Sequence, residues 1–209
     1  KSDINYVYGQ EDLPTFDNFG ATLIGFIIFF FVFLVSGISF LQERNSGTLE
    51  KLLSTPIRRW EIVVGYVLGF GLFTVLQSFL ISWYCVYVLK VMMIGSFALI
   101  LLITLLTAMI ALTLGILAST LANNEFQMIQ FIPLIIVPQI FFSGLFDLPP
   151  GMEVVGYVMP LYYIADALTE VMIRGSGFPV IAGDLGIILA WSLLFMTLNT
   201  LLLKKYRRV

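Results

Sequence analysis

Residues 91–124 read VMMIGSFALILLITLLTAMIALTLGILASTLANN, a stretch without a single aspartate, glutamate, lysine or arginine. A helix needs about 20 residues to cross the hydrocarbon core of a bilayer, and a charge at its centre costs roughly 2.5–3.5 kcal/mol. Charged residues are therefore expected near the ends of membrane spans. The stretch is long enough for one span, which we predict at residues 97–121.

Further uncharged runs lie on both sides of this stretch and predict spans at residues 20–41, 62–89, 126–145 and 185–203. The composition agrees, because 59% of the chain is hydrophobic and 11% is charged, against about 25% charged in an ordinary soluble domain. A disordered chain would need low hydrophobicity and high charge. The predicted fold is an all-α membrane protein with five transmembrane helices.

A sixth apolar segment, residues 154–168, is too short for a span and carries Pro160 in its middle. Proline removes a backbone donor and clashes with the preceding helical turn, so we predict a broken element, re-entrant or interfacial, within an external region at 147–183. Gly65 and Gly69 are spaced for close helix packing. We expect that packing inside one subunit, with a dimer contact as the alternative.

The distribution of charge predicts the orientation. Five spans place 8 of the 11 basic residues on one side, in the 42–61 loop and the C-terminal tail, and 9 of the 13 acidic residues on the other. The positive-inside rule makes that loop and the C-terminus cytoplasmic, in the plasma membrane, with residue 1 outside. Residues 1–19 do not resemble a signal peptide. We expect them to form an external segment that joins an earlier span upstream.

The loop between the first two spans predicts a short amphipathic helix within residues 47–55. Thr48 is a plausible N-cap, Glu50 suits the first turn, and Pro56 ends the element. The spacing i, i+3, i+4 gives one apolar face, formed by Leu49, Leu52 and Leu53. Periodicity alone leaves two readings open: a helix in the lipid headgroup layer, or a helix that docks onto a protein partner.

The residues of this loop carry a resemblance to a known family. Residues 43–62 read Glu-Arg-x-x-Gly-Thr-Leu-Glu-x-Leu-Leu-x-Thr-Pro-Ile-x-Arg-x-Glu-Ile, which resembles the signature loop of ABC-2-type transporter permeases. The prolines and polar residues of 133–161 look like the fifth helix of that family and its broken external hairpin. The motifs at 8–9 and 16–17 resemble the subclass with a large external domain. The chain would then be the C-terminal part of a six-span permease.

The resemblance implies that the loop is a coupling helix, seated in a groove of a separate ATP-binding subunit. Leucines would fill that groove, Glu43, Arg44 and Glu50 would orient the loop, and Arg58 would anchor it at the membrane face. We expect that Leu52→Asp abolishes binding of the partner. The complete set of expected coupling residues is Glu43, Arg44, Gly47, Thr48, Leu49, Glu50, Leu52, Leu53, Pro56, Arg58 and Glu61.

In the family that the chain resembles, the fifth helix lines the pathway, and it corresponds to the span predicted here at 126–145. A substrate path is therefore expected along this span and the span at 20–41, lined by Phe30, Phe33, Gln130 and Gln139. For the two glutamines an interhelical hydrogen bond is the favoured alternative. For the phenylalanines the alternative is general hydrophobicity toward lipid.

The chain itself is not expected to be an enzyme. It contains no G-x-x-x-x-G-K-[ST] phosphate-binding loop and no histidine, and we expect no catalytic residue, metal or cofactor in it. ATP and Mg would bind to the partner subunit. The expected partners are an ABC ATP-binding subunit, a second permease subunit in a homo- or heterodimer, and membrane lipid, with no nucleic acid.

The predicted function is export of an amphipathic drug, lipid or related substrate. A structural or regulatory membrane subunit that moves nothing is one alternative, and an ion-coupled carrier is the other. The second is disfavoured because no predicted span carries a charge near its middle.

Overall fold

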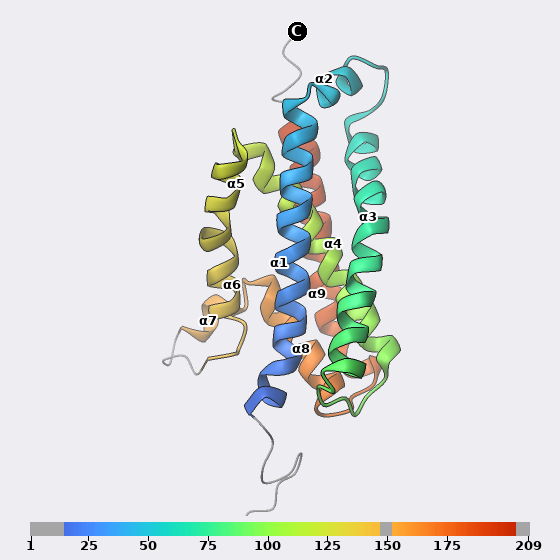
Figure 1. Cartoon of the computed structure of the whole chain (residues 1–209), viewed down its shortest axis with the longest axis vertical. Helices are drawn as coiled ribbons and strands as arrows, with labels where there is room; N and C mark the ends of the chain where they lie inside the picture. Colours follow the sequence, from blue (N-terminus) through green and yellow to red (C-terminus); the bar gives the residue numbers. More distant parts are fainter. Residues whose placement is uncertain (1–14, 147–151, 204–209) are drawn as a thin grey trace, which may run out of the picture.

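Long helices form the framework of the computed structural model, which describes residues 15–146 and 152–203. Four of them stand side by side along the long axis of the molecule (Figure 1). They are α1 (Thr15–Asn45), α3 (Arg59–Trp83), α4 (Phe97–Leu121) and α9 (Phe178–Leu202), with α3 extended by a π-helical turn, η1 (Tyr84–Val88). Each is long and apolar enough to cross a membrane, so the chain is an all-helical, multi-pass membrane protein.

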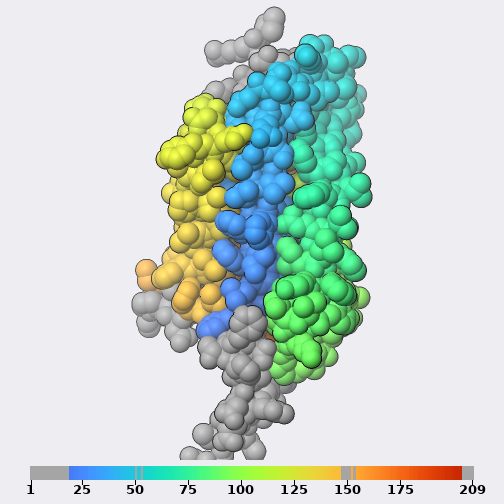
Figure 2. Space-filling model, in the orientation of Figure 1, coloured from blue at the N-terminus to red at the C-terminus, as the bar shows by residue number. Residues whose placement is uncertain are grey.

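The shorter helices lie at the ends and on one side of this framework. They are α2 (Thr48–Leu53), α5 (Glu125–Phe131), η2 (Ile132–Ile136), α6 (Val137–Phe141), α7 (Glu153–Gly156) and α8 (Pro160–Met172). The α2 helix joins α1 to α3 at the end of the bundle where α9 finishes (Figure 1). In the space-filling view, α1 fills the centre of this face, between α3 and the α5–α6 segment (Figure 2).

The α4 helix is the core of the bundle. In its most apolar stretch 56% of the residues are buried, against 22% in α3. It crosses α1 at two glycines, Gly37 and Gly115. A Cβ atom on Gly115 would lie 2.6 Å from the carbonyl oxygen of Phe33, and one on Gly37 would lie 3.2 Å from the carbonyl oxygen of Gly115. Small residues at a crossing let two membrane helices approach closely, so this contact fixes α1 against α4.

The spans predicted at 20–41, 62–89 and 97–121 are confirmed as long helices, the last with the predicted bounds. The span predicted at 126–145 is instead a shorter apolar helix over Glu125–Phe141. Its regular hydrogen bonding gives way to a π-helical turn that contains Pro133, which has no backbone N–H to donate. The last span begins at Phe178, before residue 185, because Asp184 lies inside α9 rather than marking its end.

Two further expectations need correction. Pro160 does not interrupt a helix, because it is the first residue of α8, where the missing N–H costs nothing. The predicted break therefore falls between α7 and α8. Gly65 and Gly69 do not pack inside the subunit, since a Cβ atom on either would meet nothing within 4 Å. The face of α3 that carries them is open in the single chain.

Candidate coupling loop

The turn between α1 and α2 depends on Gly47. Its φ of +77° lies in the left-handed region, which glycine adopts without steric cost. The Gly47 N–H donates to the Arg44 carbonyl (3.2 Å), and the Gly47 carbonyl accepts from the Lys51 N–H (3.1 Å). The α2 helix therefore begins at Thr48 itself, one residue earlier than an N-cap at Thr48 would give. The Thr48 hydroxyl instead lies 2.9 Å from the hydroxyl of Ser46.

Within α2 the apolar face is turned toward the bundle. Leu49 is 1% exposed and belongs to the hydrophobic core of this chain, and Leu52 is half-buried. Leu49 therefore does not fill a groove on another protein in this conformation. The outward face carries Thr48 and Lys51, both exposed. The side chains of Glu50 and Leu53, also expected in the coupling set, lie outside the described residues.

Local hydrogen bonds hold both ends of the return segment, residues 54–58, which connects α2 to α3. The hydroxyls of Ser54 and Thr55 donate to the carbonyls of Lys51 (2.7 Å) and Leu52 (2.6 Å), which satisfies acceptors at the end of α2. Pro56 lies shortly after α2 in this exposed return, as expected for a residue that cannot continue a helix. The Arg58 N–H donates to the Glu61 carboxylate (2.8 Å), so Glu61 caps the start of α3.

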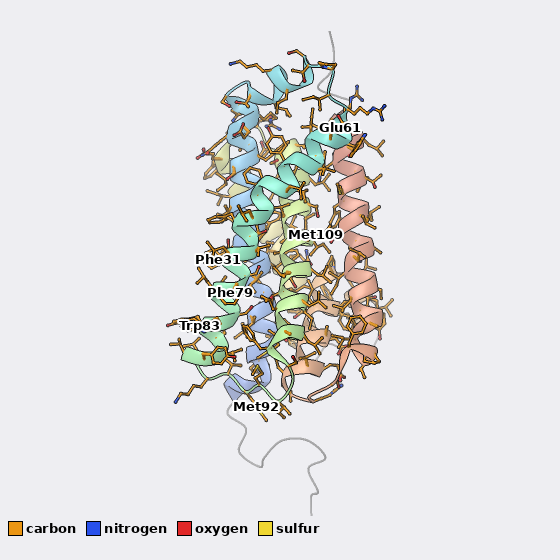
Figure 3. The ribbon with its side chains drawn as sticks, turned by 90° about the vertical axis from the view of Figure 1, so that its right-hand side faces the viewer. Phe31, Glu61, Phe79, Trp83, Met92 and Met109 are labelled. Carbon is orange, nitrogen blue, oxygen red and sulfur yellow. The ribbon has the colours of Figure 1, made fainter. Side chains whose placement is uncertain are left out.

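A pocket of about 360 Å³ opens between the end of α1, α2 and the start of α3. Its polar groups are two carboxylates, Glu43 and Glu61, and the hydroxyls of a threonine and a tyrosine, and the rest of its wall is apolar. The lining residues are Glu43, Thr48, Leu52, Ile57, Glu61, Ile62, Gly65 and Tyr66. Figure 3 labels Glu61, whose place at the start of α3 marks this end of the bundle. The loop thus encloses a hollow rather than packing solidly onto the helix ends.

Arg44 is bound inside the chain rather than presented to solvent. Its guanidinium donates to the carbonyl oxygen of Ser119 (2.7 Å) and to that of Ala122, at the C-terminal end of α4. Beside it, the Gln42 amide donates to the Glu125 carboxylate (2.9 Å) at the start of α5. A cation at a helix C-terminus satisfies free carbonyls and opposes the negative end of the helix dipole. The base of the coupling loop is therefore tied to the turn between α4 and α5.

Sequence reasoning missed this connection. The partners of Arg44 and Gln42 lie 75 to 83 residues away, and no local pattern links them. The sequence offers two local signals. Arg44 follows one predicted span, and polar residues, beginning at Asn123, follow another. Neither indicates which carbonyls the cation will find.

The residues expected along a substrate path do not form one lined cavity in the single chain. Phe33 is buried in the core and Phe30 is half-buried, whereas Gln130 is exposed on α5. The Gln139 side chain is 4% exposed, and its oxygen accepts the Leu161 N–H at the start of α8 (3.2 Å). Gln139 thus makes the hydrogen bond between elements that was the alternative for the two glutamines.

Comparison with known proteins gives a family and several relatives. The family described as ABC-2 type transporter matches residues 4–173. ABC transporter G family member 20 of Dictyostelium discoideum is 25% identical over 175 residues, which cover 82% of this chain and 24% of that protein. The probable multidrug ABC transporter permease YbhR of Escherichia coli is 22% identical over 183 residues, which cover 86% of this chain and 48% of YbhR.

A third relative is the linearmycin resistance permease protein LnrN of Bacillus subtilis, 26% identical over 176 residues, or 80% of this chain and 45% of LnrN. The chain thus spans less than half the length of each of these relatives. The matched region contains α1 to α8, including the loop and the turn that Arg44 binds. On this match and this helical architecture, the chain belongs to the ABC-2 type transporter family, as a membrane domain of an ABC permease.

Proposed function

We propose that this chain is the permease part of an ATP-driven exporter, and that α2 is the element on which a separate ATP-binding subunit acts. The observation that carries the proposal is the position of α2 between two long apolar helices at one end of the bundle, with Thr48 and Lys51 exposed on its outer face. In this arrangement a partner meets the outer face of α2, while Leu49 fixes its inner face to the bundle.

The contacts of the loop give a route for movement. Displacement of α2 pulls on the end of α1, and the bonds of Arg44 and Gln42 carry that displacement to α4 and α5. ATP and Mg act on the partner subunit in this scheme, and this chain only changes shape. The loop and the C-terminus are cytoplasmic, and α5–α6 completes a fifth crossing. The protein works as a pair of permease subunits.

Two observations support the proposed substrate class, the names of relatives and the composition of the spans. Relatives named as multidrug and linearmycin resistance permeases support an amphipathic drug or lipid moved outward. The described spans carry no lysine or arginine in their middle portions. A substrate path between such spans suits an apolar substrate with few polar groups.

The test is co-purification of the full-length protein with the ATP-binding protein encoded beside its gene, followed by ATP hydrolysis assays in lipid nanodiscs. Thr48→Trp and Lys51→Glu change the exposed face of α2, and Lys90→Glu reverses an exposed charge outside α2. We expect the first two to lower the retained ATPase by tenfold or more and the third to leave it unchanged.

Three outcomes would count against the proposal. Failure of the wild type to bind an ATPase would reject it and favour a helix that serves only the headgroup layer. Binding without stimulation by any candidate substrate would favour a structural subunit. Transport that depends on an ion gradient and not on ATP would favour a carrier.

A further inference from the structure

A groove separate from the coupling pocket lies between the first turn of α3 and the last turns of α9. Its volume is about 300 Å³, and it is lined by Trp60, Leu193, Met196, Thr197, Thr200 and Leu201. The hydroxyls of Thr197 and Thr200 donate to the carbonyls of Leu193 (2.8 Å) and Met196 (3.0 Å). Their polar atoms are thus satisfied within α9, and the groove offers a hydrocarbon surface.

Trp60 lines the groove from α3 and carries a hydrogen-bond donor, and two arginines precede it in the sequence. Trp60 is 50% exposed, and no hydrogen bond of its indole N–H is found in the described part of the chain. Arg58 and Arg59 precede it, and the ion pair between Arg174 and Glu170 is the one found among the described residues, so neither arginine has a carboxylate partner there. Near Glu61, side chains that end in blue nitrogen atoms project beside the end of α9 (Figure 3).

Two carboxylates at this end of the bundle, those of Glu61 and Glu43, belong to the coupling pocket. The Glu61 carboxylate accepts the Arg58 backbone N–H and lines the coupling pocket, as does Glu43. An apolar groove that opens beside Trp60 and the two arginines that precede it fits a molecule that combines a hydrocarbon chain with an anionic head.

We propose that the groove between α3 and α9 binds an anionic glycerophospholipid. One acyl chain lies against Leu193, Met196 and Leu201, and the phosphate lies among Trp60, Arg58 and Arg59. Arginine suits phosphate because its planar guanidinium can donate two parallel hydrogen bonds, and tryptophan is favoured at the membrane interface. The inference does not depend on which substrate the protein moves.

Such a lipid joins two helices at the point where the coupling loop ends. The α3 helix is the least buried of the four long helices, and its first turn follows the return from α2. An anionic lipid in the groove therefore holds the start of α3 against α9. The site regulates how firmly the loop is anchored, through the lipid composition of the membrane.

The test uses tryptophan fluorescence in the full-length protein. The described region contains three tryptophans, Trp60, Trp83 and Trp191. Replacement of every tryptophan other than Trp60 by phenylalanine leaves one reporter at the groove, and a second protein that retains only Trp83 reports on a distant part of α3. Each is placed in phosphatidylcholine nanodiscs that contain a minority of brominated-acyl phosphatidylglycerol or, separately, of brominated-acyl phosphatidylcholine.

Trp60 should be quenched more strongly by brominated phosphatidylglycerol than by brominated phosphatidylcholine, and Trp83 equally by both. Each basic residue near the surface contributes about a fivefold preference for anionic lipid. Arg58→Gln with Arg59→Gln should therefore reduce the preference at Trp60 by tenfold or more. The matched control removes two exposed charges elsewhere, Lys51→Gln with Lys90→Gln, and should keep it.

Two results would overturn the proposal. Equal quenching of Trp60 by both lipids would show ordinary boundary lipid without a site. Loss of the preference when inorganic phosphate is added at constant ionic strength would show an anion site with no role for the acyl chain. The same double arginine change in the protein that retains only Trp83 should leave the Trp83 signal as it was, which shows that the variant is folded and keeps its result interpretable.

Discussion

The Arg44 guanidinium donates a 2.7 Å hydrogen bond to the carbonyl oxygen of Ser119, and so the last turn of α1 caps the last turn of α4. The same guanidinium also binds the Ala122 carbonyl. One side chain thus serves two acceptors that the helix cannot satisfy itself. Arg44 is a structural member of the coupling region, placed between the loop and the most buried helix.

Arg44→Gln should therefore lower stability as well as coupling. Hydrogen bonds that involve a charged group contribute about 1.5–3 kcal/mol, and the glutamine amide is too short and neutral to replace both. We expect a clear drop in the apparent Tm of the purified protein in detergent. Lys51→Gln, at an exposed position of the same loop, is the control and should leave the Tm unchanged. Equal Tm values for the two variants would show that the Arg44 contacts are not stabilising.

Gly115→Ala should destabilise the bundle. The added Cβ would lie 2.6 Å from the Phe33 carbonyl oxygen, too close for any contact without movement of α1. Overpacking of this kind costs about 1–3 kcal/mol. Gly65→Ala is the matched control, since its Cβ would meet nothing within 4 Å and alanine favours helix. Thermal unfolding of both variants measures the difference, and a Gly115→Ala protein as stable as the control would place the α1–α4 crossing elsewhere.

Gln139→Leu should weaken the attachment of α8. It leaves the buried Leu161 N–H without its acceptor, a loss of about 1–3 kcal/mol. Gln139→Glu retains an acceptor oxygen and should lose less. Limited proteolysis near α8, followed over time, reports the loosened attachment, with Gln130→Leu on the exposed face of α5 as the control. Proteolysis at the wild-type rate in Gln139→Leu would exclude this role for Gln139.

Stability should also depend on the protonation of Asp166 in α8. Burial raises the pKa of its carboxyl above the ordinary value, the negative charge of Glu170 raises it further, and Arg174 partly lowers it. A raised pKa means that the folded state holds the proton more tightly than the unfolded state does, so this group favours folding more as the pH falls. Asp166→Asn should raise the Tm at alkaline pH, with a gain that vanishes toward acidic pH.

The control for this pH dependence is Asp166→Glu, which still titrates and should follow the wild type. Tm values measured across the pH range in one buffer system give the comparison. A gain from Asp166→Asn that is the same at every pH would assign the effect to packing rather than to charge.

How well the sequence predicts a feature of this structure depends on how far apart in the sequence the interacting residues lie. The bounds of α4 follow from a charge-free run that ends in a polar turn, a local property, and they are correct. The α2 helix and the effect of Pro56 are local as well. By contrast, the charge of Asp184 predicts a start for α9 at residue 185, whereas the helix begins at Phe178 and contains Asp184.

The inner face of α2 shows where local reasoning ends. Periodicity correctly gives Leu49 and Leu52 one apolar face, but it cannot say whether that face meets this chain or another. The burial of Leu49 depends on where α1 and α3, the two helices that α2 connects, place α2 on the bundle. The bond from Arg44 to Ser119 has the same character, because it exists only after α1 and α4 have packed.

The close approach of Gly37 and Gly115 has a mechanical consequence. A crossing this tight acts as a fulcrum, and it lies eight residues from the α2 end of α1 and eighteen from Phe19 near the other. At 1.5 Å per residue these lever arms measure about 12 and 27 Å. If α1 tilts there as a rigid rod, a small push on α2 becomes a displacement about twice as large, in the opposite direction, across the membrane.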